Sequence, residues 1–113
     1  MATNRAEVLR GTLDLMILRT LDLQPLHGSG LIDRLQQVTA GTIDVGPGSI
    51  FPALYRLEDR GFVKGRWGQS DRGRRARFYT LTARGRRQLG LETKNWERIA
   101  LAISRVLKPG RSS

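Results

Sequence analysis

The sequence has 113 residues, no cysteine, and 20 Lys and Arg against 10 Asp and Glu, which gives a formal net charge of +10. A chain of this length forms one domain with a modest core, and small cores are often completed by oligomerisation. The absence of cysteine excludes disulfides and thiolate metal sites and fits a reducing cytosol, and we expect neither a signal peptide nor a membrane span because no apolar run is long enough.

The first part of the chain predicts two helices. Residues 1–11 are interpreted as a polar lead-in, after which Thr12 can cap a helix whose apolar residues recur at helical spacing up to residue 23. A turn with proline and glycine follows at residues 24–28, and a second helix is predicted over residues 28–39. In the loop at residues 40–48, the alternating residues 42–45 are interpreted as one edge strand.

The segment PGSIFPALYRLEDRG, residues 47–61, predicts a third helix with two different sides. Apolar residues at i, i+3, i+4 and i+7 predict the buried side, namely Ile50, Ala53, Leu54 and Leu57. Pro52 is tolerated in the first turn, and Gly61 ends the helix as a C-cap. The opposite side is predicted to face a partner through Ser49, Phe51, Tyr55 and Arg56. The alternative is that Phe51 and Tyr55 complete the core.

After Gly61 the apolar period changes from that of a helix to that of a strand. Residues 62–67 and 77–81 are predicted to form a β-hairpin, joined by a basic loop over residues 68–76, with Tyr79 and Leu81 directed inward. Thr82 is predicted to cap a long last helix that reaches about Leu107.

This order of elements predicts a mainly α protein with a small β-hairpin. Three helices followed by a hairpin indicate a winged helix-turn-helix DNA-binding domain over residues 1–81. The long C-terminal helix occupies residues 82–108, and residues 109–113 form a polar tail. In this arrangement the third helix is the recognition helix and the hairpin is the wing.

The positive charge is concentrated between Arg56 and Arg87, where 11 basic and 3 acidic residues carry +8 of the total of +10. Such a block favours a polyanionic partner, nucleic acid before a membrane surface, although a solvated surface is the alternative. The wing contributes four arginines, which we expect to contact the DNA backbone or minor groove: Arg72, Arg74, Arg75 and Arg77.

The last helix carries its own apolar stripe. Leu89, Trp96 and Ile103 are seven residues apart, and Ile99 and Val106 occupy the next positions of the same seam. So small a domain cannot cover a stripe of this length, so we expect these five residues to form the interface of a two-fold homodimer. For Trp96, burial in the core is one alternative and contact with a planar ligand is another.

The sequence shows no catalytic constellation and no convincing metal site. His27 is the only histidine, and a turn or cap role suits it better than metal binding. The segment GPGS lacks the lysine and the spacing of a phosphate-binding loop. We therefore expect neither an enzyme nor a bound cofactor.

Three segments resemble the PadR family of bacterial transcriptional regulators: PLHGSGLIDRLQQ, GPGSIFPALYRLEDRGFVKGRWG and RRARFYTLTARGRRQL. The resemblance covers about residues 9–107, and the single long last helix resembles the short PadR subfamily. It implies a winged-helix dimer that binds a palindromic operator in double-stranded DNA and usually represses transcription. Some short members bind planar aromatic compounds through a tryptophan in this helix, which implies Trp96 as a contact for a small aromatic effector.

The chain departs from the family pattern at two positions. Ser29 stands where an aromatic residue is frequent, and Phe51 stands where tyrosine is common, so a hydroxyl contact to DNA is lost there. The resulting prediction is a cytoplasmic, dimeric DNA-binding repressor that is associated with the nucleoid when it is bound to DNA. Release from the operator by a small ligand is left open. The alternative is a winged-helix interaction module that binds a protein partner or structured RNA.

Overall fold

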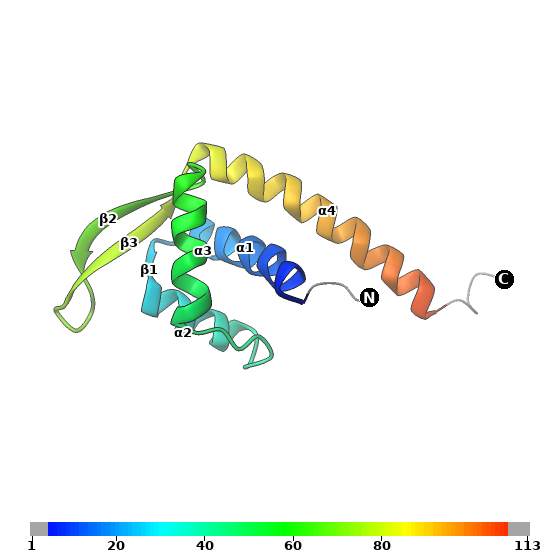
Figure 1. The fold of residues 1–113 in the computed structure, drawn as a ribbon, viewed down its shortest axis with the longest axis horizontal. Coiled ribbons are helices and arrows are strands. Elements are labelled where there is room, and N and C mark those ends of the chain that lie inside the picture. Colours follow the sequence, from blue (N-terminus) through cyan, green and yellow to red (C-terminus); the bar gives the residue numbers. More distant parts are fainter. Residues whose placement is uncertain (1–4, 109–113) are drawn as a thin grey trace.

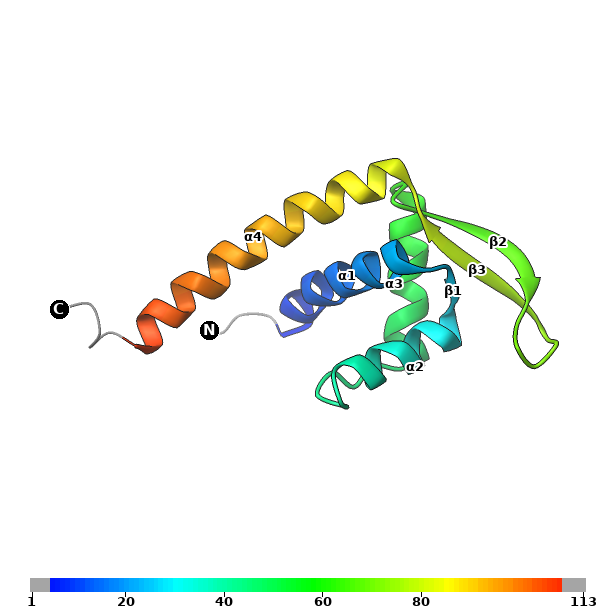
Figure 2. The same cartoon turned by 180° about the vertical axis from the view of Figure 1, so that it is seen from behind.

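The computed structural model describes the backbone of residues 5–108 and the side chains of residues 11–108. The elements in this range are α1 (Arg5–Leu23), β1 (Leu26–His27), α2 (Gly28–Val38), α3 (Pro47–Asp59), β2 (Val63–Gln69), β3 (Arg75–Leu81) and α4 (Ala83–Leu107). The chain is elongated, with extents of 59 × 28 × 27 Å, because the β2–β3 hairpin projects on one side and α4 on the other (Figures 1 and 2). None of the helices in the described range is long and apolar enough to cross a membrane.

The core lies where the first three helices meet the base of the hairpin. Its fully buried side chains come from α1, α2 and α3, namely Ile17, Leu18, Leu31, Ile50 and Leu54. The predicted inner stripe of α3 is buried along its whole length, and Tyr79 and Leu81 are directed inward as predicted. The mainly helical winged helix-turn-helix fold is therefore confirmed.

The end of α3 follows the predicted glycine C-cap. Gly61 has a φ of +79°, which glycine adopts at little cost. Its N–H donates to the Glu58 carbonyl and the Phe62 N–H donates to the Leu57 carbonyl, each at 2.9 Å. These two hydrogen bonds close the helix and direct Phe62 into the core, just before β2 begins.

The prediction for the start of the first helix was wrong. The helix begins at Arg5, and Thr12 lies inside it rather than capping it. The segment RAEVLRG contains mostly good helix formers and no proline, so its polarity is compatible with an exposed helical end as well as with a lead-in.

The predicted edge strand at residues 42–45 was also wrong. That segment is irregular, whereas Leu26 and His27 form β1 and pair with Tyr79 and Phe78 of β3. The sheet order is β1-β3-β2. The edge of β3 that does not pair with β2 lies beside the turn before α2. That turn therefore supplies the third strand, β1.

The hairpin is longer than predicted. Its ladder runs from Val63 opposite Leu81 to Gln69 opposite Arg75, which leaves only residues 70–74 as the loop. Ser70 and Arg74 close the loop through a 2.8 Å backbone hydrogen bond. We call β2, β3 and this loop the wing. Arg75, predicted in the loop, is therefore held in β3 together with Arg77.

The start of α4 is fixed against the end of α3. Thr82 caps the helix as predicted, because its hydroxyl accepts from the Gly85 N–H at 2.9 Å. Gly85 is buried, and a Cβ there would lie 2.7 Å from Leu81 and 2.9 Å from the Phe62 carbonyl carbon. The absence of a side chain at Gly85 thus lets α4 pack directly on the wing base.

Candidate nucleic-acid interface

The outer side of α3 is open to solvent in its first half. Ser49 and Pro52 are exposed, and Tyr55 is 61% exposed. These three side chains lie opposite the buried stripe of the same helix. Their hydroxyl and aromatic groups suit contacts with phosphates, bases and the thymine methyl group in a major groove.

Phe51 supports this surface from inside. Its ring packs against the core and lies over Gly28 at the start of α2, where a Cβ would come within 2.5 Å of the ring carbon Cε1. The structure therefore favours the alternative noted for Phe51, completion of the core. Because α2 and α3 approach closely at this point, the first residue of α2 has no room for a side chain. This explains the glycine at position 28.

Arg56 is also engaged within the protein. Its Nη2 donates to Asp14 Oδ1 of α1 at 2.6 Å, and the two side chains are only 26% and 15% exposed. An ion pair with this much shielding is screened less by salt than a surface pair. Arg56 thus orients α3 on α1 instead of reaching outward.

The wing loop presents a compact group of cations. Arg72, Arg74 and Arg75 are exposed, and they share a hollow of about 470 Å³ with the first two turns of α2, including Ser29 and Asp33. Because β2 and β3 hold the loop ends in register, these arginines are carried at a defined distance from α3. Their placement suits contact with a phosphate backbone.

Three side chains on one face of the wing and one of α3 form a continuous row. Arg77 pairs with Glu58 of α3, Trp67 stands opposite Arg77 in the hairpin, and the Arg75 guanidinium lies 4.6 Å from the Trp67 ring centroid. We call Glu58, Arg77, Trp67 and Arg75 the wing ladder. Sequence reasoning expected Glu58 to set phosphate register or to pair within the protein, and it gave no role to Trp67. The strand alternation that places residue 67 on the face of residues 75 and 77 was the available signal.

Two pKa values respond to this packing. The hydrogen bond from Arg77 to Glu58 raises the pKa of the guanidinium further above its ordinary value. Burial raises the pKa of the neighbouring Tyr79 phenol, and the Glu58 carboxylate adds to the effect. Arg77 is therefore charged and Tyr79 neutral throughout the physiological pH range.

The structure divides the predicted dimer residues of α4 into two groups. Leu89 is buried in the domain core, so it is not available to a partner and that part of the prediction was wrong. The remaining four residues, which we call the α4 stripe, are 43–73% exposed: Trp96, Ile99, Ile103 and Val106. Leu89 is covered because α1 packs on the first half of α4, whereas the second half projects beyond it (Figure 1).

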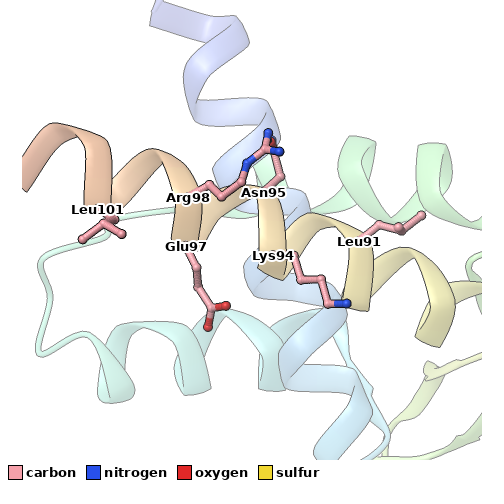
Figure 3. Close-up of a pocket in the computed structure, with 6 residues that line it drawn as sticks. All are labelled: Leu91, Lys94, Asn95, Glu97, Arg98 and Leu101. Carbon is pink, nitrogen blue, oxygen red and sulfur yellow. The ribbon is translucent and has the colours of Figure 1, made fainter.

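The other side of α4 carries a shallow surface pocket that sequence reasoning missed. It has a volume of about 660 Å³ and is lined by Leu91, Lys94, Asn95, Glu97, Arg98 and Leu101 (Figure 3). Leu91 follows Leu89 by two residues, or roughly 200° around a helix, so this side faces away from the core. The two leucines of this pocket, Leu91 and Leu101, are separated by charged side chains, so they gave no helical periodicity in the sequence.

His27 has a structural position at the start of α2. It is the N-cap residue of α2 and its ring lies 5.0 Å from that of Phe78, centroid to centroid. Among the described residues, no group of three His, Asp or Glu side chains is placed to hold a metal ion.

The chain was compared with known proteins. Residues 17–91 match the model of the transcriptional regulator PadR-like family. A transcriptional regulator from Clostridium thermocellum is 24% identical and superposes with a TM-score of 0.81 over 90% of this chain and 99% of that one. A PadR-like transcriptional regulator from Bacillus cereus is also 24% identical. It superposes with a TM-score of 0.78 over 90% of this chain and 97% of that one.

A curated relative, an uncharacterized protein from Lysinibacillus sphaericus, is 22% identical over 84% of this chain and 87% of its own. The structural matches agree with the fold described above, and the family match spans α1 to the first part of α4, including α3 and the whole wing. The chain therefore belongs to the PadR-like family of DNA-binding transcriptional regulators, which are not enzymes.

Proposed function

We propose that the chain is a dimeric repressor that binds a palindromic operator in double-stranded DNA. The observation that carries this proposal is the α4 stripe, whose four apolar side chains are 43–73% exposed on a helix that extends past its own domain. Full burial of such side chains contributes roughly 1.5–3 kcal/mol each. A second copy related by a two-fold axis would cover both stripes with the same residues.

In this dimer the two α3 helices enter major grooves of the two half-sites. Ser49 and Tyr55 contact base edges or nearby phosphates, while Arg72, Arg74 and Arg75 contact the backbone or the minor groove alongside. Half-sites one helical turn apart would be separated by about 34 Å. Phe51, Arg56 and Arg77, which have partners within the domain, hold these elements in place.

The same dimer would give Trp96 a place at the interface. A tryptophan that is 47% exposed on the α4 stripe could stack on a planar aromatic effector between the subunits. Binding there would alter the packing of the two α4 helices and thus the separation of the two α3 helices, which is a route to release from the operator.

The proposal is tested with the full chain and labelled duplexes that tile the promoter region of its own gene. We expect fluorescence anisotropy to detect one preferred duplex, bound as a dimer, with an affinity that falls steeply as salt rises. In vitro transcription from that promoter should decrease when the protein is added. Competition by structured RNA equal to that by duplex DNA would instead support an interaction module, and salt-insensitive binding would contradict the proposal.

A further inference from the structure

The wing carries one of the two tryptophans of the chain, Trp67, in an exposed position. Trp67 is 55% exposed and lies outside the hydrophobic core of the described residues. We propose that Trp67 is an additional DNA contact, and that the wing ladder holds it at a fixed position relative to α3. This inference rests on the DNA-binding role and adds a residue to its contact surface.

The wing ladder connects Trp67 to the recognition helix through successive contacts. Glu58, in the last turns of α3, pairs with Arg77 of β3. The Arg77 guanidinium lies 6.0 Å from the centroid of Trp67, which is its direct partner across the hairpin. The Arg75 guanidinium lies 4.6 Å from the same centroid, so two cations lie close to the indole. A side chain restrained in this way loses less freedom when it meets a ligand.

Gly65 provides the space in which the wing ladder forms. It lies on the same face of β2 as Trp67, directly opposite Tyr79. A Cβ at position 65 would come within 2.6 Å of Arg77 Cζ and Nη2. The guanidinium therefore lies flat against the bare backbone of β2, and a side chain at position 65 would displace it without removing any charge.

The chemistry of this surface suits a DNA backbone. The face of the wing that holds Trp67 continues from α3, because Glu58 and the buried Tyr79 join the two elements there. Arg75 supplies a cation for a phosphate, and the indole beside it offers a flat apolar surface to the adjoining deoxyribose. The opposite face of β2 carries Lys64 and Arg66, both exposed cations with no aromatic partner among the described residues.

The first experiment uses tryptophan fluorescence. In the Trp96→Phe variant, Trp67 is the only tryptophan. Binding of the preferred duplex, followed independently by anisotropy of a label on the DNA, should quench the Trp67 emission and reduce its accessibility to acrylamide. If the labelled duplex binds while Trp67 emission and accessibility stay unchanged, the inference fails although the DNA-binding role stands. If the wild-type chain binds no duplex either, the proposed function itself fails.

The second experiment measures affinity as a function of salt. Trp67→Ala should weaken duplex binding about tenfold, and Trp67→Phe should restore most of the loss. Gly65→Ala should weaken binding about two- to fivefold by displacing Arg77 from the indole. None of these changes removes a cation, so the slope of log affinity against log salt should stay the same.

Arg66→Gln, on the opposite face of the same strand, is the matched control: it should leave the Trp67 quenching unchanged. Circular dichroism and thermal unfolding of each variant identify losses that come from misfolding. Wild-type affinity for Trp67→Ala in a folded protein would overturn the inference. An altered salt slope for Trp67→Ala would assign the effect to the wing arginines and would also overturn it.

Discussion

Neighbouring side chains of α3 have different tasks at the scale of single residues. Phe51 lies over Gly28 and Arg56 pairs with Asp14, so both fix the helix on the domain. Ser49 and Tyr55 are exposed on the remaining side. A recognition surface needs both kinds of residue, because an exposed group discriminates between partners only when its backbone is held still.

The ion pair between Arg56 and Asp14 should contribute to stability. Asp14→Asn leaves the Arg56 guanidinium, which is only 26% exposed, without its carboxylate. We expect the free energy of unfolding, measured by urea denaturation, to fall by about 1–3 kcal/mol. Arg19→Ala, which breaks a pair whose arginine is 62% exposed, should change it by less than about 1 kcal/mol. Equal effects of the two substitutions would contradict this assignment.

The exposed wing arginines should contribute to DNA affinity through charge alone. Replacing Arg72 with glutamine is expected to weaken binding by a similar factor on the preferred duplex and on unrelated DNA. The slope of log affinity against log salt should decrease by about one unit, because one fewer counterion is released. Arg98→Gln on α4, an exposed cation far along the chain from the wing, should leave the slope unchanged. A sequence-specific loss for Arg72→Gln would argue against a backbone contact.

At the scale of elements, α4 contains two glycines in different surroundings. Gly85 packs on the Phe62 backbone at the wing base, whereas a Cβ at Gly90 would meet nothing within 4 Å. The same substitution should therefore have opposite effects at the two positions.

Gly85→Ala should lower the free energy of unfolding by about 1–3 kcal/mol, because the added methyl group has no room. Gly90→Ala should raise it by about 0.4–1 kcal/mol, because alanine restricts the unfolded chain and favours a helix. Urea denaturation of both variants measures the difference. Stabilisation by Gly85→Ala would show that α4 can move away from the wing base at little cost.

The whole molecule is extended because two of its elements project in opposite directions. The wing leaves the domain on one side and α4 on the other (Figure 2). The wing carries six basic residues against one acid, and most of the exposed large apolar side chains of the described residues lie on α4. Assembly through α4 would thus leave α3 and the wing of each copy open to DNA.

A charge within the α4 stripe should dissociate the dimer. Ile103 is 50% exposed, so Ile103→Glu should preserve the fold of the domain while it opposes burial of the stripe. Sedimentation velocity should show a monomer in place of a dimer, and affinity for a palindromic duplex should fall because two linked half-sites are no longer bound together.

Leu101→Glu is the corresponding control. Leu101 lies on the pocket side of the same helix and is 53% exposed. This change should leave the dimer intact. If Leu101→Glu dissociates the protein and Ile103→Glu does not, the interface is formed by the opposite side of α4.

Much of this architecture could be predicted from local sequence patterns. The apolar periods of α3 and β3, the C-cap at Gly61 and the N-cap at Thr82 depend on interactions within a few residues, so their signals survive in the sequence. The winged helix-turn-helix order followed from these elements, and the family from the motifs that they carry. The start of α1 was missed because a polar helical end and a polar lead-in have similar compositions.

Only the tertiary structure decided which side chains are already engaged. Arg56 and Asp14 are 42 residues apart, and Arg77 and Glu58 are 19 apart, so no local pattern connects them. The sequence by itself determined that the positive charge is concentrated between Arg56 and Arg87 and that an apolar stripe runs along the last helix. The packing of α1 on α4 determined that Leu89 belongs to the core, and the pairing of β2 with β3 brought Trp67 close to two arginines. Such contacts depend on how distant elements meet in space, which hydrophobic period and charge alone do not specify.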